Sequence, residues 1–354
     1  MKIFDGHNDI LHKITSSVNP LDSQAFLVKG TGQMDYPRAL QGEFCGGFFA
    51  VYTSNSPEVP TAEERMVLSD KGYHIPLPPP LPFDYAHNST HTMIELMKKI
   101  EQDSLGGLKI TTSIAEIQEC IESNVIAAVL HLEGAEPILP NLDNLLDFYR
   151  LGVRSLGITW SRPNAFGHGV PFVYPGHPDS GPGLTPPGKD LVKACNRTGI
   201  LIDLAHLNEK GFWDVAQLTS APLVSTHTAA HKLVPKARNL TDDQLRAVGE
   251  SGGVVGVIFS VNDLDGERRP KEDAPIAVII KHIEYIADLI GADHVAFGSD
   301  FDGTKIPSQL GDISRFQLLV ELLEKAGFSA LEREKICRKN WLRVLGDTLR
   351  DEVY

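Results

Sequence analysis

The first residues that could form a chemical site lie near the start of the chain, in "KIFDGHNDI". His7 and Asp9 stand two positions apart after a short apolar run, so in an extended segment both side chains point to the same side. Imidazole and carboxylate groups are the usual nitrogen and oxygen ligands of zinc-like ions. A single pair of this kind is more often part of a loop that caps neighbouring backbone, so this motif alone does not establish a metal site.

Other ligand-type residues close further apolar runs. Glu133 ends "VIAAVLHLE", His206 ends "ILIDLAH", His227 ends "PLVSTH" and Asp300 ends "HVAFGSD". One histidine at a strand end is usually a packed or capping residue. Six ligand-type residues at the ends of five strands indicate one shared site, because the carboxyl ends of the strands of an α/β barrel open on the same face.

Three histidines and three carboxylates exceed the ligand set of one catalytic zinc ion, which typically has three protein ligands and a water molecule. They suit two zinc ions that share a bridging carboxylate and a bridging water or hydroxide. We predict that one ion binds His7 and Asp9, that the second binds His206 and His227, and that Glu133 bridges the two ions.

The predicted nucleophile is a metal-bridging hydroxide, because a metal-bound water can have its pKa lowered to about 7. Asp300 is the predicted general base, which takes the proton of the water and passes it to the leaving group. Four other residues compete for these roles or lie behind the ligands: His131 one layer below Glu133, Glu136 and Asp302 just beyond Glu133 and Asp300, and the buried carboxylate Asp203.

The elements that must position these residues are short apolar runs that alternate with amphipathic stretches. Strands are predicted at residues 2–4, 47–52, 125–133, 153–160, 200–206, 222–227, 253–259 and 294–300. Helical patterns are predicted at residues 90–102, 141–152, 188–199, 241–253 and 274–291. Eight such units predict an α/β protein with a TIM-like (β/α)8 barrel over residues 1–354. A doubly wound open sheet is the alternative, but no glycine-rich fingerprint follows the first strand.

Two stretches exceed what a minimal barrel needs. Residues 53–86 contain "HIPLPPPLP" and are too rich in proline for a regular helix or strand. Residues 161–188 contain "HPDSGPGLTPPG" and are the second excursion. Both stretches follow a strand, so we expect loop insertions on the C-terminal face of the barrel, near the mouth of the active site. A plain surface excursion remains the alternative for residues 53–86.

Composition excludes several classes of protein. The chain has 354 residues, of which 42% are hydrophobic and 22% charged, with a net charge of -13. It lacks the basic stripe that nucleic acid demands and an apolar run of the ~18 residues that a membrane span requires. A polar N-terminus and four scattered cysteines without Cys-x-x-Cys spacing predict a cytoplasmic protein with reduced thiols.

The motifs "GHND", "LEGAE", "LIDLAH", "VSTHTAAHKL", "ARNLTDDQL" and "FGSDFDG" resemble, in the same order, those of the membrane (renal) dipeptidase family. The resemblance runs from Gly6 to the C-terminal region. It implies a (β/α)8 barrel with a binuclear zinc centre that hydrolyses dipeptides to free amino acids, and a possible homodimer. It matches five residues to the metal ligands, with the glutamate as bridge, and a sixth to the catalytic carboxylate: His7, Asp9, Glu133, His206, His227 and Asp300.

The resemblance also implies two substrate contacts. Arg238, in "KARNL", matches an arginine that contacts the substrate or its developing oxyanion, and a guanidinium group suits either anion. Trp160 stands where some members carry a histidine that polarises the scissile carbonyl, so we expect it to line the side-chain pocket instead. The secretion and lipid-anchor signals and the paired cysteines of membrane-bound mammalian members are absent, so the chain resembles a soluble bacterial-type member.

We therefore expect zinc-dependent hydrolysis of small dipeptides, with a D-residue allowed at the C-terminal position. Two alternatives stay open at this point. Another amidohydrolase-type barrel, such as a lactonase, deaminase or phosphotriesterase, typically begins with His-x-His and often bridges its metals with a modified lysine. This chain has His-x-Asp, and its fourth strand, "VRSLGITW", has no lysine. A non-catalytic metal-binding protein would be favoured by a missing ligand or base, and none is missing.

Overall fold

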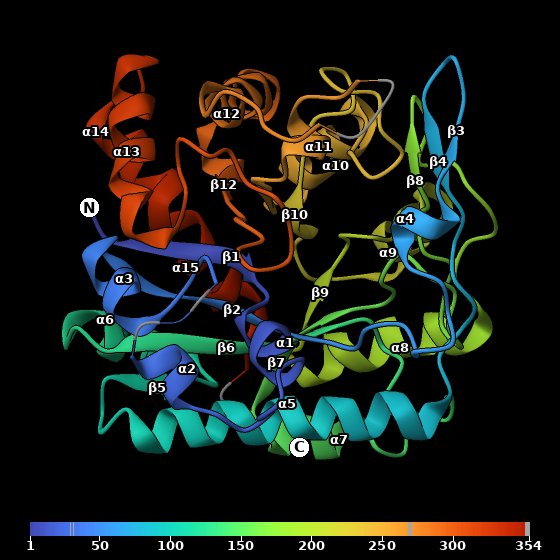
Figure 1. Ribbon diagram of the computed structural model, residues 1–354, viewed down its shortest axis with the longest axis horizontal. Coiled ribbons are helices and arrows are strands. Elements are labelled where there is room, and N and C mark those ends of the chain that lie inside the picture. Colours follow the sequence, from blue (N-terminus) through green and yellow to red (C-terminus); the bar gives the residue numbers. More distant parts are fainter. Residues whose placement is uncertain (29, 31, 268–270, 351–354) are drawn as a thin grey trace.

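The barrel strands run parallel to one another and enclose a nearly closed cylinder (Figure 1). The computed structural model describes residues 1–28, 30, 32–267 and 271–350. In these ranges the predicted α/β barrel with eight parallel strands is confirmed, and its strands follow one another around the sheet in chain order. These strands are β1 (Ile3–Asn8), β2 (Phe44–Tyr52), β6 (Ile126–Glu133), β7 (Val153–Gly157), β9 (Leu201–Asp203), β10 (Val224–Thr228), β11 (Val254–Val257) and β12 (Val295–Phe297).

The last and first strands close the barrel at the end where the ligand-type residues lie. The amide of Asp9 donates a hydrogen bond to the Phe301 carbonyl at 2.8 Å, and the amide of Asp300 donates to the His7 carbonyl at 3.0 Å. Deeper in the barrel, the Asp5 carboxylate accepts hydrogen bonds from the Ser299 amide at 2.8 Å and the Ser299 hydroxyl at 2.6 Å. The two ends of the sheet are therefore joined by polar groups directly beneath the candidate site.

Helices surround the barrel, as Figure 1 shows. The α-helices are α1 (Ile10–Thr15), α2 (Gln24–Leu27), α3 (Tyr36–Gln41), α4 (Ala62–Arg65), α5 (Phe83–Asp103), α6 (Ile114–Glu122), α7 (Leu145–Arg150), α8 (Pro186–Thr198), α9 (Glu209–Leu218), α10 (Asp242–Glu250), α11 (Val261–Leu264), α12 (Ala277–Ile290), α13 (Phe316–Lys325), α14 (Ala330–Glu334) and α15 (Asn340–Thr348). Short helical turns are η1 (Ala292–His294), η2 (Ile313–Arg315) and η3 (Lys335–Lys339).

The predicted helices form, with boundaries set by local chemistry. Helix α8 begins two residues before the predicted start, because the Thr185 side chain accepts from the Gly188 amide and a proline is favourable in the first turn. It ends at Gly199, which adopts the left-handed conformation that glycine tolerates without steric cost.

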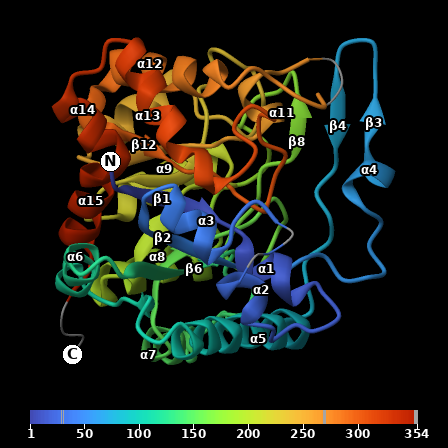
Figure 2. The same cartoon turned by 60° about the vertical axis from the view of Figure 1, so that its left-hand side comes forward.

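The prediction that residues 53–86 form no regular helix or strand is wrong, and residues 161–188 contain a strand as well. Within them lie α4 and the short strands β3 (Val67–Leu68), β4 (Tyr73–Ile75) and β8 (Phe172–Tyr174), which pair antiparallel in the order β3-β4-β8. Figures 1 and 2 both show this small sheet at the periphery, beside the barrel. The proline-rich run 76–82 that follows β4 is itself neither helix nor strand. A further strand, β5 (Leu108–Ile110), was not predicted and pairs with the first residues of β6.

The interior of the barrel is filled in layers. Along β6, alternate residues point inward, so Ala127 and Val129 pack in the interior cluster below His131 and Glu133. Helix α15 seals the bottom with Trp341, which is fully buried and donates its indole N–H to the Phe297 carbonyl at 2.9 Å. The barrel is tight here, because a Cβ atom at Gly6 would lie 2.5 Å from both the Thr226 carbonyl oxygen and the Trp341 ring.

We predict that Trp341→Ala lowers the free energy of unfolding by about 3–5 kcal/mol, because it empties a buried indole site and leaves a carbonyl without its donor. The midpoint of urea unfolding, followed by far-ultraviolet circular dichroism with a chelator present, measures the loss. The matched control is Leu331→Ala on α14, a 55% exposed side chain whose removal should change stability by less than about 0.5 kcal/mol. Equal midpoints for the two variants would contradict this account of the core.

Candidate metal centre

The strand ends bring the predicted ligand-type residues together. His7 lies in β1 and Asp9 directly follows it, Glu133 is the last residue of β6, and His227 lies in β10. His206 and Asp300 lie three residues beyond β9 and β12, each in the left-handed backbone region, with φ of 62° and 59°. Non-glycine residues rarely adopt this conformation, and where they do it is often at functional sites.

Glu133 lies at the centre of the cluster, and its two oxygens face different histidines. Its Oε1 atom lies 3.2 Å from Nε2 of His206 and 3.6 Å from Nε2 of His227. Its Oε2 atom lies 3.6 Å from Nε2 of His7, and the same nitrogen lies 3.6 Å from Oδ2 of Asp9. A carboxylate with one oxygen toward each group of ligands has the arrangement that a bridge between two cations requires.

The ligand atoms fall into two overlapping groups, each within 4.8 Å. One comprises His7, Glu133 and His227, and the other comprises His7, Asp9 and Asp300. The geometry therefore does not separate His7 from His227, whose ring centroids are 3.8 Å apart. It also brings Asp300 among the possible ligands, whereas the sequence analysis gave this residue only the role of base.

Hydrogen bonds behind the ligands orient their rings. The Thr226 hydroxyl donates to the Asp203 carboxylate at 2.6 Å and lies 2.9 Å from Nδ1 of His227. Because the single hydroxyl proton is directed to Asp203, this hydroxyl accepts from Nδ1–H of His227, and the Nε2 lone pair is left to face the cluster. Nδ1 of His206 lies 2.8 Å from the Ser161 hydroxyl, and this contact orients that ring as well. Partners of this kind are characteristic of metal-binding histidines.

Several buried polar atoms of the cluster lack a hydrogen-bond partner among the described residues. They include both ring nitrogens of His7 and Oδ1 of Asp9. Burying such atoms without a partner costs free energy, and coordination by a cation removes that cost. The donor set of imidazole nitrogens and carboxylate oxygens is the one that zinc prefers, so the residues fit a zinc centre.

The charges of the cluster are strongly coupled. The pKa of Glu133 lies well below its usual range: burial alone would raise it, but His7 and His206 together lower it. Burial also opposes the shift at His7, yet Glu133 and Asp9 raise its pKa well above normal. Burial and then the neighbouring Asp9 raise the pKa of Asp300 well above that of an ordinary aspartate.

The two remaining histidines are neutral at physiological pH. Burial, followed by the Arg238 charge, lowers the pKa of His206 to about 4. Burial, followed by the His7 charge, lowers the pKa of His227 well below its usual value. Both rings can therefore offer a lone pair to a cation without first losing a proton.

A cavity of about 240 Å³ opens above the cluster. Trp160 lines it, with its ring 5.1 Å from Tyr52, 5.8 Å from Phe172 and 5.6 Å from His206 between centroids. Arg238 is 4% exposed, and its guanidinium group donates to the His227 carbonyl at 2.8 Å. The two predicted substrate contacts therefore differ in position: Trp160 forms a wall of the cavity, and Arg238 is anchored beside a predicted ligand.

The competing residues have other partners. Nδ1 of His131 lies 2.9 Å from the Ser155 hydroxyl, one layer below Glu133. Glu136 accepts from Arg162 at 2.7 Å. Asp302 accepts from the amides of Gln33 and Met34 at 2.7 and 3.1 Å. These contacts favour Glu133 over Glu136 as the bridging ligand and Asp300 over Asp302 as the base, as predicted from the sequence.

Part of the cavity lining was not predicted from the sequence. Tyr52, His12 and Phe172 contribute to the wall, together with Asp263 and Thr304. Tyr52 closes β2 as Glu133 closes β6, and the two residues are direct neighbours in the sheet. The candidate residues were chosen because they close predicted barrel strands. The same criterion applied to the strand predicted at residues 47–52 would have identified Tyr52. Phe172 lies in β8, a strand that the sequence pattern did not reveal.

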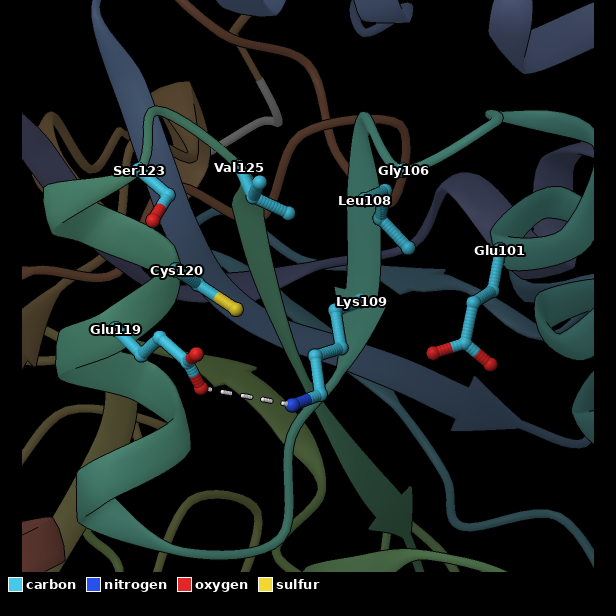
Figure 3. Close-up of a pocket in the computed structure, with 8 residues that line it drawn as sticks. All are labelled: Glu101, Gly106, Leu108, Lys109, Glu119, Cys120, Ser123 and Val125. Atoms are coloured by element: carbon cyan, nitrogen blue, oxygen red, sulfur yellow. Dashed lines mark ion pairs between the residues drawn. The ribbon is translucent and has the colours of Figure 1, made fainter.

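A second cavity, of about 450 Å³, lies at the opposite end of the barrel (Figure 3). Leu108, at the start of β5, and Val125, just before β6, line it. Val125 and Glu133 are eight positions apart along an extended strand, which is about 26 Å. Lys109 in this cavity forms ion pairs with Glu116 and Glu119. This cavity is therefore separate from the candidate metal centre.

The chain matches one known protein family over almost its whole length. The family described as membrane dipeptidase (peptidase family M19) matches residues 1–352. A metallopeptidase from Rhodobacter sphaeroides, whose structure holds a phosphinate mimic of the dipeptide L-Ala-D-Ala, is similar with a TM-score of 0.93 and 40% identity, over 98% of this chain and 99% of that one. The structure of a family M19 metallopeptidase described as the dipeptidase AC is similar with a TM-score of 0.91 and 39% identity, over 99% of both chains.

Among curated sequences, an uncharacterized protein encoded in the 5′ region of pqqA of Klebsiella pneumoniae is 45% identical over 252 residues. The match covers 71% of this chain and 93% of that protein.

We predict that zinc binding to the metal-free protein releases protons and strengthens as the pH rises from 6 to 8. The raised pKa values of His7 and Asp300 make each group keep its proton to a higher pH than an ordinary histidine or aspartate, and a cation displaces these protons, whereas the lowered pKa values of His206 and His227 leave those rings with little proton to lose. Isothermal titration calorimetry in two buffers of different ionisation enthalpy should detect about one proton or more per chain. A zinc affinity that does not change over this pH range would contradict the charge assignment.

Proposed function

This chain belongs to the membrane dipeptidase family, peptidase family M19, and is a metallodipeptidase; on that premise we propose that it hydrolyses dipeptides to free amino acids with two zinc ions. The observation that carries this proposal is the placement of Glu133, whose two carboxylate oxygens face separate histidines at the base of a cavity of about 240 Å³. The cavity is small, which suits a short substrate with both termini inside the site.

We assign His7 and Asp9 to one zinc ion, His206 and His227 to the other, and Glu133 to both. Zinc ions held there would lower the pKa of a water molecule and polarise the scissile carbonyl. The hydrogen bonds from Nδ1 of His206 and His227 to Ser161 and Thr226 keep both rings oriented for this task. The family match and the buried donor set support this assignment.

Asp300 is proposed to move the proton. It lines the cavity next to Asp9, and burial raises its pKa. A carboxylate in this position accepts a proton from the attacking water and delivers it to the nitrogen of the leaving amine. The amide of Asp300 donates a hydrogen bond to the His7 carbonyl, which holds the turn in place. We propose that this keeps the carboxylate within reach of both the attacking water and the nitrogen of the leaving amine.

Arg238 is proposed to hold the terminal carboxylate of the substrate. Zinc ions held by the cluster would supply positive charge near the scissile carbonyl, so the terminal carboxylate of a dipeptide needs a cation of its own. A guanidinium group binds a carboxylate through paired charge-assisted hydrogen bonds. The bond from Arg238 to the His227 carbonyl ties this group to the strand that carries a ligand, which fixes the spacing between the carboxylate and the zinc ions.

Trp160 is proposed to line the pocket that receives a substrate side chain. Its ring packs among Tyr52, Phe172 and His206, so it presents an apolar surface to the cavity. The relative from Rhodobacter sphaeroides holds a mimic of L-Ala-D-Ala, which supports the proposal that L-X–D-Y dipeptides are substrates here as well. Recognition through the carboxylate agrees with this, because it does not require a chain that continues beyond the C-terminal residue.

Two further expectations stay predictions. The resemblance implies a homodimer, which analytical ultracentrifugation would test. A cytoplasmic location rests on the reduced thiols: Cys45, Cys120, Cys195 and Cys337 are all free and buried. In the part of the chain that the structure describes, no helix is both long enough and apolar enough to cross a membrane.

We predict that the zinc-loaded protein releases free amino acids from L-X–L-Y and L-X–D-Y dipeptides, and that chelation abolishes the reaction. Asp300→Asn should lower kcat by about 100-fold or more, since an amide cannot carry the proton. Amino-acid release measures the rate, and elemental analysis measures the bound zinc. Asp300→Asn should keep two zinc ions per chain, and His227→Ala should lose zinc.

Loss of zinc in Asp300→Asn would show that this residue is a ligand and not the base. No turnover of any dipeptide by protein that holds two zinc ions per chain would reject the proposed function, and lactones and cyclic amides would then be tested.

We predict that Arg238→Met lowers kcat/KM for dipeptides by about 30-fold or more, because it removes a charge-assisted pair worth roughly 2–5 kcal/mol. The wild type should prefer a dipeptide to the corresponding dipeptide amide, and the variant should lose that preference. Arg238→Lys is the control, because it keeps the charge but not the fork of donors, and should fall between the two. If the preference for the free carboxylate survives in Arg238→Met, the substrate carboxylate binds elsewhere.

A further inference from the structure

A larger chamber adjoins the catalytic cavity. It has a volume of about 580 Å³, against about 240 Å³ for the cavity over the cluster. Four residues line both spaces and form the neck between them: Phe172, Asp263, Gly303 and Thr304. Small-molecule sites typically measure about 300–1,000 Å³, so the inner cavity alone is small for a dipeptide with two full side chains, and the two spaces together fall within the range.

One side of the chamber is apolar. The small sheet beside the barrel supplies Leu68 from β3, Tyr73 and Ile75 from β4, and Phe172 from β8. Met66 adds to the same wall. Leu68 and Tyr73 are direct cross-strand neighbours, and side chains alternate along a strand, so Val67 and His74 point away from the chamber and do not line it.

Charged residues also line the chamber, and their charges balance: three lysines, Lys236, Lys271 and Lys305, and three carboxylates, Glu63, Asp263 and Glu272. Lys236 pairs with Asp263 at 2.8 Å, and Lys305 pairs with Glu272 at 2.6 Å. The Lys236–Asp263 pair is almost completely buried, with side-chain exposures of 4% and 8%. Because the charges of the described lining balance and these two lysines already have partners, this lining favours a substrate group by its size and apolar surface, not by its charge.

The neck lies beside the residue proposed to hold the substrate carboxylate. Lys236 and Asn239 flank Arg238 in the chain, and both bind Asp263: Lys236 through its ammonium group, and Asn239 through a hydrogen bond of 2.9 Å to the Asp263 carbonyl. The loop that carries Arg238 is therefore fastened to the neck from both sides. A carboxylate on Arg238 belongs to the C-terminal residue, whose side chain leaves from the adjacent Cα atom.

We infer that the outer chamber receives the side chain of the C-terminal residue of the dipeptide and selects bulky, uncharged groups such as leucine, phenylalanine and tryptophan. This inference rests on the proposed dipeptidase function and on the assignment of Arg238 to the substrate carboxylate. In this proposal the small β3-β4-β8 sheet determines which C-terminal side chains are accepted, while the residues that carry out the reaction come from the barrel.

The test compares zinc-loaded wild type, Leu68→Trp and Met66→Trp on two series of dipeptides, Ala–X and X–Ala, with X as alanine, leucine, phenylalanine or tryptophan. In the wild type, kcat/KM for Ala–Phe should lie within about tenfold of that for Ala–Ala. Either variant partly fills the chamber and should lower kcat/KM for Ala–Phe and Ala–Trp by about tenfold or more, with Ala–Ala and the X–Ala series within about twofold.

Val67→Trp is the matched control, since Val67 neighbours Leu68 on β3, is exposed as well, and faces away from the chamber. It should leave both series unchanged. Turnover of Ala–Ala with rejection of bulky C-terminal residues by the wild type would overturn the inference and leave the dipeptidase function intact. An effect confined to the X–Ala series, or no effect of either filling variant, would also overturn it. No turnover of any dipeptide would reject the inference together with the proposed function.

Discussion

The constraint on which this structure depends is the concentration of buried negative charge at the mouth of the barrel. Asp9 and Glu133 are buried there with the half-buried Asp300 beside them, and withdrawal from water makes an ionised carboxylate costly unless a cation shares its charge. His206 and His227 are neutral and contribute lone pairs in place of charge. Burial and then the neighbouring Asp9 raise the pKa of Asp300, and a bound divalent cation would offset the cost of placing these groups together. Folding, metal binding and catalysis are therefore linked through the same few carboxylates.

The layers beneath the site hold this arrangement in place. The Asp5–Ser299 contact joins the first and last strands just below the ligands, and the Asp203–Thr226 contact directs the ring of His227. Below them Trp341 plugs the barrel. Each layer is buried and hydrogen-bonded, so the ligands are fixed by contacts that do not involve the substrate. Such support is what a preorganised site requires, because a ligand that moves by about 1 Å loses much of its catalytic effect.

The proposed chemistry and the proposed specificity come from different parts of the chain. The candidate ligands and the proposed base lie on or next to barrel strands, an architecture shared by many α/β barrels. The outer chamber is walled by the insertions that follow β2 and β7, whose short strands β4 and β8 pair with each other across about a hundred positions of sequence. Insertions of this kind can change without disturbing the metal centre, so substrate preference can vary within one family while the reaction is kept.

The sequence by itself determined the barrel and the identity of the residues that converge at its mouth. Alternating and continuous apolar runs report local burial, and parallel strands in a barrel must end on one face, so His7, Glu133, His227 and the others could be predicted to meet. Only the tertiary structure decided that His7 contacts both halves of the cluster, that Arg238 is tied to the backbone of His227, and that Tyr52 and Phe172 wall the cavity. These features depend on contacts between segments far apart in the chain. Strand β4, just before the proline-rich run 76–82, is too short to carry a periodicity that would predict its pairing with β8, because that pairing depends on a partner far away in the chain.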